Sequence, residues 1–320
     1  MASPATTPPA NRVPVGIVAN ITVPATSANL GPGFDCAGVA VGLYDELEIR
    51  TTETGFSAEI EGEGQNYLPT DARHLIIAQI RARLERLGWH LPGLQLKAIN
   101  RIPHSRGLGS SAAAHIAAAL AVKALLPPDC AITRDDLLQW ASEAEGHPDN
   151  VAPAVFGGLT FSWDEAGHYQ SLQLTPHPEI TPVVAIPAKP LSTAAARSLL
   201  PATVSYPEAV ANASRAALLA PAMTTNPDLL MPATQDWLHQ QYRAPSMPET
   251  LRHITALRSE QHAAVVSGAG PTLCVFAATP AEAEVVVTKL QERAAKSAQH
   301  WDVRILPIAA EGATMEVFRP

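Results

Sequence analysis

The chain contains few cysteines, no excess of basic residues and no long apolar run. Its three cysteines, Cys36, Cys130 and Cys274, stand far apart in the 320 residues without a CxxC pair, which argues against structural zinc and fits a reducing compartment. The formal net charge of −8 argues against nucleic acids or an anionic membrane as partners, since both need basic clusters. Because no apolar run reaches about eighteen residues, no membrane span is expected, and we expect a cytoplasmic protein.

The beginning of the chain differs in composition from the rest. Residues 1–16, MASPATTPPANRVPVG, are rich in Pro, Ala and Thr and lack the apolar run of a signal peptide, so we expect a disordered tail there. Hydrophobic residues make up 47% of the chain, enough for a large core in one or two domains. Near residue 175 the sequence changes to strands punctuated by proline, and we therefore expect domains over 17–175 and 176–320.

The order of apolar and turn residues predicts a mixture of helices and strands. An amphipathic helix is expected over 71–88 with Asp71 as N-cap, and another over 133–146 capped by Thr133. Glycine and proline predict a loop over 23–38, and a second loop is expected to lead from His147 into a strand. Further strands are expected over 16–25, 39–52, 56–64 and 93–102, a strand–turn–strand unit over 263–279, and a last helix over 280–296. Because strands and helices do not alternate strictly, the expected class is α+β.

The stretch PHSRGLGSSAAAHIAAALAV, Pro103 to Val122, joins a glycine-serine loop directly to a predicted alanine helix. Glycines let backbone N–H groups approach a ligand, and a helix start offers unpaired N–H groups with a partial positive charge, so together they bind phosphate. Ser110 and Ser111 add hydroxyls for a phosphate oxygen or a magnesium ion, and Arg106 adds charge at the rim. The loop is not a Walker A loop, because no Lys follows Gly109. A plain glycine turn before a packing helix fits the same residues.

The sequence of this stretch is similar to the Pro-x-x-x-Gly-Leu-Gly-Ser-Ser-Ala motif of the GHMP kinases. VPATSANLGPGFD (Val23–Asp35) resembles the N-terminal motif of that superfamily and VVSGAGPTLCVF (Val265–Phe276) its C-terminal glycine motif, in the same order. Three further segments, EGHPDNVAPAVFGGLT, STAAAR and LHQQYR, resemble the homoserine kinases among them. The resemblance implies a two-domain GHMP kinase fold, with a ribosomal S5 domain 2-like N-terminal domain and a ferredoxin-like C-terminal domain.

The resemblance also implies an activity, ATP-dependent phosphorylation of the side-chain hydroxyl of L-homoserine in threonine synthesis, and a homodimer. ATP is then expected over the glycine-serine loop between the domains, with His74 near the adenine. The residues implied for ATP are Pro103, His104, Ser105, Arg106, Gly107, Leu108, Gly109, Ser110, Ser111, Ala112, Ala113 and His74.

The chemistry of homoserine can be matched to residues in the resembling segments. Its carboxylate suits the guanidinium groups of Arg197 and Arg243, and its ammonium suits Asp35. Outside these segments, a lone arginine is usually a surface residue, an asparagine such as Asn29 can stabilise a turn, and His147 can be a loop residue. The substrate-binding residues that the resemblance implies are Asn29, Asp35, His147, Asn150, Thr193, Arg197, Arg243 and Gly268.

Magnesium needs hard oxygen ligands, and the resemblance pairs Ser111 with Glu145 as the metal ligands. Glu143 is the competitor, expected to be a solvated helix carboxylate. Related kinases place an aspartate base where this chain has Asn150, and an amide cannot act as a base. Asp149 is expected to point elsewhere, so we expect no protein base. Positioning and charge neutralisation then carry the reaction, with Asn150 orienting the hydroxyl.

Two other functions fit the same motifs. One is phosphorylation of a different small alcohol by a related kinase. The other is a catalytically silent sensor that binds nucleotide or an amino acid, against which the presence of Ser111, Glu145, Asp35 and both arginines argues.

Overall fold

The computed structural model describes residues 11–320. The expected disordered tail lies outside the described residues for positions 1–10 and is wrong for 11–16. There, β1 (Asn11–Arg12) pairs in parallel with β5 (Trp89–His90), and Val13 is fully buried. Among the described residues, no helix combines the length and the apolar character needed to cross a membrane.

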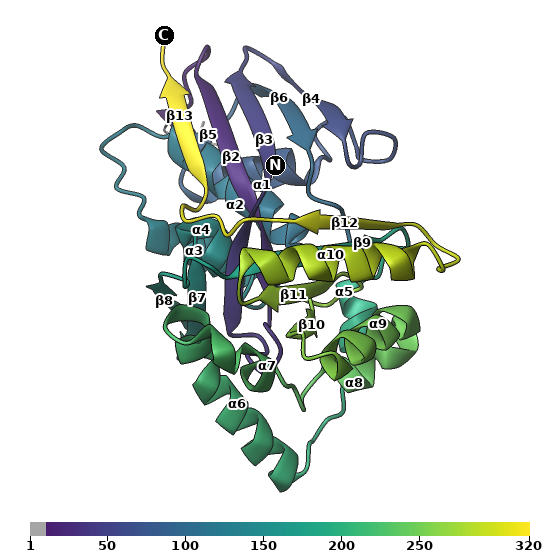
Figure 1. Cartoon of the computed structure of the whole chain (residues 1–320). Coiled ribbons are helices and arrows are strands. Elements are labelled where there is room, and N and C mark those ends of the chain that lie inside the picture. Colours follow the sequence, from purple (N-terminus) through teal and green to yellow (C-terminus); the bar gives the residue numbers. More distant parts are fainter. Residues whose placement is uncertain (1–10) are drawn as a thin grey trace.

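A seven-stranded sheet forms the larger half of the molecule (Figure 1). Its order is β13-β2-β3-β6-β4, and the β7–β8 hairpin continues it from the first residues of β3. The strands are antiparallel to their neighbours except β4, which runs parallel to β6. They span Val18–Ala28 (β2), Ala37–Thr51 (β3), Gly55–Gly62 (β4), Gly93–Asn100 (β6), Leu159–Glu165 (β7), His168–Leu174 (β8) and Thr314–Phe318 (β13).

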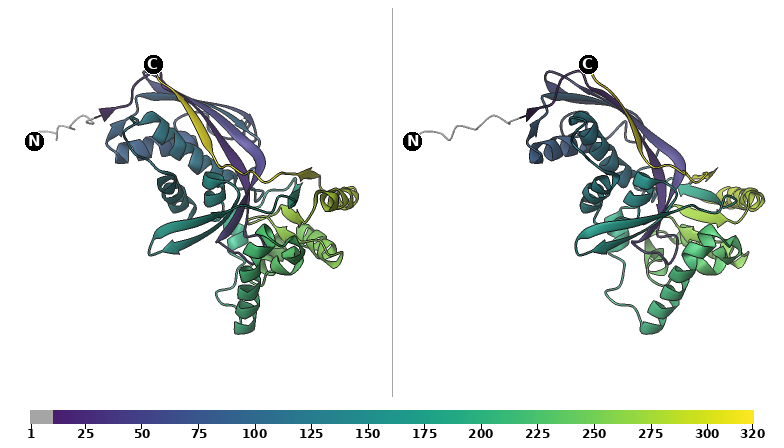
Figure 2. Two further views of the ribbon diagram at one scale, coloured as in Figure 1. Left: turned by 60° about the vertical axis from the view of Figure 1, so that its left-hand side comes forward. Right: turned by 90° about the vertical axis from the view of Figure 1, so that its left-hand side faces the viewer.

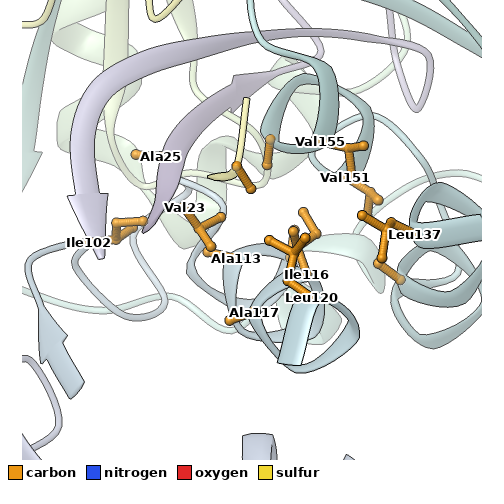
Figure 3. Packing of buried hydrophobic residues seen from close by; sticks show 14 of the residues in the cluster. Val23, Ala25, Ile102, Ala113, Ile116, Ala117, Leu120, Leu137, Val151 and Val155 are labelled. Atoms are coloured by element: carbon orange, nitrogen blue, oxygen red, sulfur yellow. The ribbon is translucent and has the colours of Figure 1, made fainter. Parts of the chain in front are cut away.

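Four helices cover one side of this sheet (Figure 2). They are α1 (Leu75–Arg86), α2 (Ser110–Leu125), α3 (Arg134–Glu145) and α4 (Val151–Phe156). The alanine-rich helix α2 lies at the centre, and eleven of its sixteen residues are buried. Figure 3 shows its Ile116 and Leu120 between Val23 of β2, Leu137 of α3 and the side chains of α4. Small alanines allow the surrounding elements to approach the helix closely, which holds the body of the helix in the core while Ser110 and Ser111 stay outside it.

The second half holds a four-stranded antiparallel sheet of order β10-β11-β9-β12. Its strands and the two helices that pack on it follow a βαββαβ order, which is the ferredoxin-like arrangement that the resemblance implied. These elements are β9 (Thr181–Pro187), α9 (Pro248–Ser259), β10 (Ala264–Val266), β11 (Leu273–Ala277), α10 (Pro280–Ala294) and β12 (Trp301–Ile305). Between β9 and α9 lie α5 (Thr193–Arg197), α6 (Tyr206–Thr224), η1 (Pro227–Leu229), α7 (Leu230–Ala233), α8 (Gln240–Arg243) and η2 (Ala244–Ser246).

Three local expectations are wrong. Helix α1 begins at Leu75 with His74 in the N-cap position, whereas Asp71 pairs with the exposed Arg73 and caps nothing. Strand β2 continues to Ala28, because its second half pairs with β3 after a bulge and so shortens the expected loop. The expected loop after His147 contains helix α4.

The last strand returns to the first sheet. In Figure 1 the yellow β13 lies beside β2, and its residues 314–318 pair with residues 18–22. The division of the chain near residue 175 stays a prediction. It would assign β13 to the C-terminal domain, although this strand pairs with the sheet of the N-terminal one.

Candidate active site

The glycine-serine loop leads into the first turn of α2 through a left-handed glycine. Gly109 is the residue before the helix and has φ 73°, a conformation that favours glycine. A Cβ there would lie 2.0 Å from Oγ1 of Thr26, and one on Gly107 would lie 2.2 Å from the carbonyl oxygen of Ser267. Glycine is therefore needed for the close packing as well as the turn. The first N–H groups of α2 have no partner within the helix and can meet an anion.

Two pockets meet at this helix start. The polar pocket is lined by Asn29, Asp35, Ser105, Gly107, Gly109, Ser110, Ser111, Ala112, Glu145, His147, Asp149, Asn150, Thr193, Arg197, Arg243, Gly268 and Ala269. The apolar pocket is lined by Asp45, Leu47, Tyr67, Leu68, His74, Leu75, Ile76, Asn100, His104, Ser105, Ser110, Ser111, Ala113, Ala114 and Ala117. Ser105, Ser110 and Ser111 line both, so the two pockets share one wall.

All eight residues expected to bind substrate line the polar pocket. They come from five separate parts of the chain and include both arginines. Most of the residues expected to bind ATP line one pocket or the other, His74 among them.

Three loop residues depart from this pattern. The guanidinium of Arg106 donates hydrogen bonds to the carbonyl oxygens of His104, Pro187 and Ala188, and therefore ties the loop to the end of β9 instead of facing either pocket. Leu108 is fully buried in the core, and Pro103, at the start of the loop, is buried too.

Glu145, at the end of α3, faces the start of α2. Its side chain is 13% exposed, and His115 Nε2 lies 3.2 Å from its Oε1. Burial by itself would raise its pKa, but the side chains of His115 and Ser111 hold the pKa of Glu145 below its ordinary value. Glu143 has 58% of its side chain exposed and lies 3.8 Å from Arg83, as expected for a solvated carboxylate.

The pair formed by Ser111 and Glu145 fits a magnesium ion in its chemistry. Both side chains offer hard oxygen donors. Oε1 of Glu145 is buried and makes no hydrogen bond of regular geometry to the described residues, so it keeps a lone pair for a cation.

Asp35 and Arg197 form an ion pair within the polar pocket. Arg197 donates two hydrogen bonds, of 2.9 and 2.7 Å, to the two carboxylate oxygens of Asp35. The backbone N–H of Asp35 donates to the side chain of Asn29, whose amide donates in turn to the carbonyl oxygen of Gly268. Asp35 has φ 57°, so the Asn29 contact holds a backbone that is unusual for a residue with a side chain.

Arg243 enters the same pocket from α8 and is 1% exposed. Its Nη1 lies 3.1 Å from the carbonyl oxygen of Gly268 and 3.1 Å from Nδ1 of His239. Its guanidinium also lies over the ring of Phe34, 5.4 Å from the centroid.

His147, Asp149 and Asn150 form a connected group beside the α2 start. His147 Nδ1 lies 2.6 Å from Asp149 Oδ1, which also accepts from the backbone N–H of Asn150. Burial alone would lower the pKa of His147, but Asp149 raises it above the ordinary value. Asn150 Oδ1 accepts a hydrogen bond from Thr26. The expectation that Asp149 points elsewhere is wrong, because its buried carboxylate lines the polar pocket and fixes both neighbours.

In the apolar pocket, His74 is buried and neither of its ring nitrogens has a partner among the described residues. Burial, followed by the nearby His104, lowers the pKa of His74. A neutral imidazole offers one donor and one acceptor to a ligand.

The sequence did not single out His115, His239, Phe34 or Thr26. His115 lies one helical turn after Ser111, so the i, i+4 spacing was a signal that could have placed it near the metal ligands. His239 stands in LHQQYR four residues before Arg243. Nothing in the sequence marks Thr26 or Phe34 as polar-pocket neighbours, because their contacts depend on tertiary packing.

Family models and relatives of similar sequence both point to the GHMP kinases. The model for the GHMP kinases N terminal domain matches residues 74–158, and that for GHMP kinases C terminal matches residues 208–296. A homoserine kinase from Streptomyces avermitilis is 46% identical over 91% of this chain and 96% of its own length. One from Clavibacter michiganensis is 44% identical over 93% of each.

Solved structures show the same fold. A homoserine kinase from Cytophaga hutchinsonii superposes with a TM-score of 0.83 at 24% identity over 93% of this chain and 97% of its own. The L. major mevalonate kinase gives a TM-score of 0.64 at 15% identity over 95% and 98%. The chain belongs to the GHMP kinases and, within them, to the homoserine kinase family.

Proposed function

We propose that this chain transfers the γ-phosphoryl group of ATP to the side-chain hydroxyl of L-homoserine, giving O-phospho-L-homoserine for threonine biosynthesis. One observation carries this proposal beyond the family: the polar pocket brings Asp35, Arg197 and Arg243 together beside the first turn of α2. A zwitterionic amino acid with a hydroxyl tail needs these charges for its head and a phosphate site for its tail.

The head of homoserine, its carboxylate and ammonium, binds by replacing the ion pair between Asp35 and Arg197. Its carboxylate takes the guanidinium groups of Arg197 and Arg243, and its ammonium takes the carboxylate of Asp35. Arg197 and Asp35 already neutralise one another, so neither stays unpaired before substrate enters. The zwitterion replaces one ion pair by two, and a substrate with a single charge would leave one partner exposed without its counter-charge.

The nucleotide lies across the shared wall of the two pockets. The adenine occupies the apolar pocket, where His74 offers its unpartnered ring nitrogens, and the phosphates lie against the first N–H groups of α2 and the hydroxyls of Ser110 and Ser111. Ser111 and Glu145 would hold a magnesium ion, which neutralises phosphate charge when bound.

The hydroxyl attacks the γ-phosphorus in line, the bond between the γ-phosphorus and the β–γ bridging oxygen breaks, and ADP leaves. The proton of the hydroxyl passes to a phosphate oxygen. In a loose transition state the nucleophile needs little deprotonation, so positioning dominates the rate. Asn150 orients the hydroxyl, and Thr26 and Asp149 in turn fix Asn150 through the contacts described above. The homodimer and the division of the chain near residue 175 belong to this proposal as further expectations.

A substrate panel tests the proposal. L-homoserine, mevalonate, galactose and L-threonine are assayed in parallel with ATP and Mg²⁺, with ADP release and phosphorylated product both measured. We expect clear preference for homoserine. Preference for another alcohol would favour a related kinase activity, and binding without turnover would favour a sensor.

A further inference from the structure

His239 lies wholly buried where three segments of the chain meet. On one side its Nε2 lies 2.9 Å from the carbonyl oxygen of Gly31, in the loop after β2, and its ring stacks on Phe34 with centroids 5.1 Å apart. On the other side its Nδ1 lies 3.1 Å from Nη1 of Arg243. One ring therefore connects the loop that carries Asp35 to the arginine on α8.

Only one protonation state of His239 satisfies both neighbours. The carbonyl of Gly31 can only accept, so Nε2 carries the proton, and the guanidinium of Arg243 can only donate, so Nδ1 is the unprotonated acceptor. Burial, the largest influence, lowers the pKa of His239, with Arg243 acting in the same direction against Asp236 and Asp35. The imidazole is thus neutral, which is the state that can accept from a guanidinium.

The contact with His239 determines which part of Arg243 remains available. Nη1 is committed to His239 and to the carbonyl oxygen of Gly268. Nε has no hydrogen-bond partner among the described residues, and no described residue accepts from Nη2. The Nε–Nη2 edge is one of the two edges at which a guanidinium binds a carboxylate with two hydrogen bonds, and Arg243 lines the polar pocket.

We propose that His239 is a positioning residue for substrate recognition: its Nδ1 anchors Nη1 of Arg243 and so presents the remaining edge of the guanidinium to the carboxylate of the amino acid. This inference rests on the proposed function. Through Nε2 the same ring also contacts the loop that carries Asp35, but substrate positioning depends on the Nδ1 side of the ring.

Two amide variants separate the two sides of the ring. In His239→Asn the amide reaches the position of Nδ1 and keeps an acceptor for Arg243, whereas in His239→Gln it reaches the position of Nε2 and keeps only a donor for Gly31. Loss of a hydrogen bond from a charged donor weakens binding by about tenfold or more. We expect the homoserine KM to rise about tenfold in His239→Gln and by less than about threefold in His239→Asn, with the ATP KM unchanged in both.

A substrate without a carboxylate distinguishes positioning from a structural defect. 3-Aminopropanol makes no contact that Arg243 could strengthen, so its kcat/KM should be the same in wild type and His239→Gln. An equal loss for 3-aminopropanol and homoserine would overturn the proposal, because it would indicate general damage to the site. A homoserine KM that rises more in His239→Asn than in His239→Gln would overturn it too, since the Gly31 contact would then be the important one.

Arg243→Lys separates this inference from the function it rests on. If that variant leaves the homoserine KM unchanged, the proposed carboxylate role of Arg243 fails. If it raises the KM while His239→Gln does not, only the positioning role fails. Should His239→Gln not fold, as judged by circular dichroism, the Asn variant decides alone: a near wild-type homoserine KM supports the proposal and a tenfold rise overturns it.

Discussion

At the scale of single residues, the polar pocket combines one ion pair that is satisfied before substrate enters with one buried cation that is not. Asp35 and Arg197 form a bidentate pair, and Arg243 is buried with one nitrogen anchored and the rest of its guanidinium without acceptors. A buried cation of this kind is costly unless it gains a partner. A ligand that carries both a carboxylate and an ammonium is therefore expected to bind this pocket most favourably.

The first prediction concerns the two arginines. Because an ammonium cannot form the planar fork of a guanidinium, Arg197→Lys and Arg243→Lys should each raise the homoserine KM by roughly ten- to a hundredfold. The ATP KM should hardly change. Steady-state kinetics with each substrate varied in turn checks this, with Arg73→Lys, a pair partner of Asp71 on the exposed surface, as control. Weaker ATP binding with unchanged homoserine binding would assign the arginines to the nucleotide.

The second prediction concerns the oxygen donors at the start of α2. Ser111→Ala and Glu145→Ala should each lower kcat by on the order of 10²–10³-fold, the usual cost of one lost electrostatic stabiliser of a transition state. Glu143→Ala removes a carboxylate two residues away that is mostly exposed and should change kcat little. Rates are compared over a range of Mg²⁺ concentrations. If Glu143→Ala were the severe variant, the wrong carboxylate would have been placed at the metal.

The identities of the site residues could be predicted because they lie in short, specific sequence motifs. Their contacts could not be predicted. The pairing of Arg197 with Asp35 joins positions far apart in the sequence, and the position of Asp149 depends on α4, which starts directly after Asn150. An extended loop over HPDN predicts that the Asp149 side chain points away from the site. Helix α4 changes the chain direction there, and the side chain faces the pocket instead.

At the scale of elements, the sequence predicts where a helix starts when the capping hydrogen bonds join residues close together in the chain. Thr133 caps α3 in a reciprocal box with Asp136, as the sequence indicated. Asp71 has the residue type of a cap, but α1 begins four residues later at Leu75. The intervening His74 is buried in the apolar pocket, so tertiary packing sets where this helix starts.

The third prediction follows from that difference. Thr133→Ala should lower the free energy of unfolding by about 1 kcal/mol, because the N–H of Asp136 loses its acceptor at the start of α3. Asp71→Ala should have a smaller effect, since it removes an exposed ion pair and one exposed hydrogen bond from the backbone N–H of Arg73. Urea unfolding followed by circular dichroism measures both. Equal losses in the two variants would mean that Asp71 stabilises α1 as a cap after all.

At the scale of the whole molecule, the fold class and the order of elements could be predicted, but the path of the last segment could not. After β12 the chain leaves the second sheet and runs back across the first. Gly42 donates to the carbonyl oxygen of Pro307. Ala309 donates to the carbonyl oxygen of Ala40 and accepts from the N–H of Gly158, and β13 then pairs with β2. No turn or cap residue marks such a return, because it is a long-range pairing between the two ends of the chain.

The last prediction tests this return. Gly312 lies where the segment passes the end of α4, and a Cβ there would lie 2.2 Å from the carbonyl oxygen of Val155. Because backbone atoms on both sides cannot yield easily, Gly312→Ala should cost about 1–3 kcal/mol of stability, as overpacking of a core does. Glu311→Ala, at the exposed neighbouring position, is the matched control and should leave the melting temperature nearly unchanged. Since α4 also carries Asn150 at its start, the displaced helix should lower kcat for homoserine in Gly312→Ala. Thermal unfolding and kinetics measured on both variants decide the matter: wild-type stability in Gly312→Ala would show that the returning segment can shift away and does not hold α4 in place.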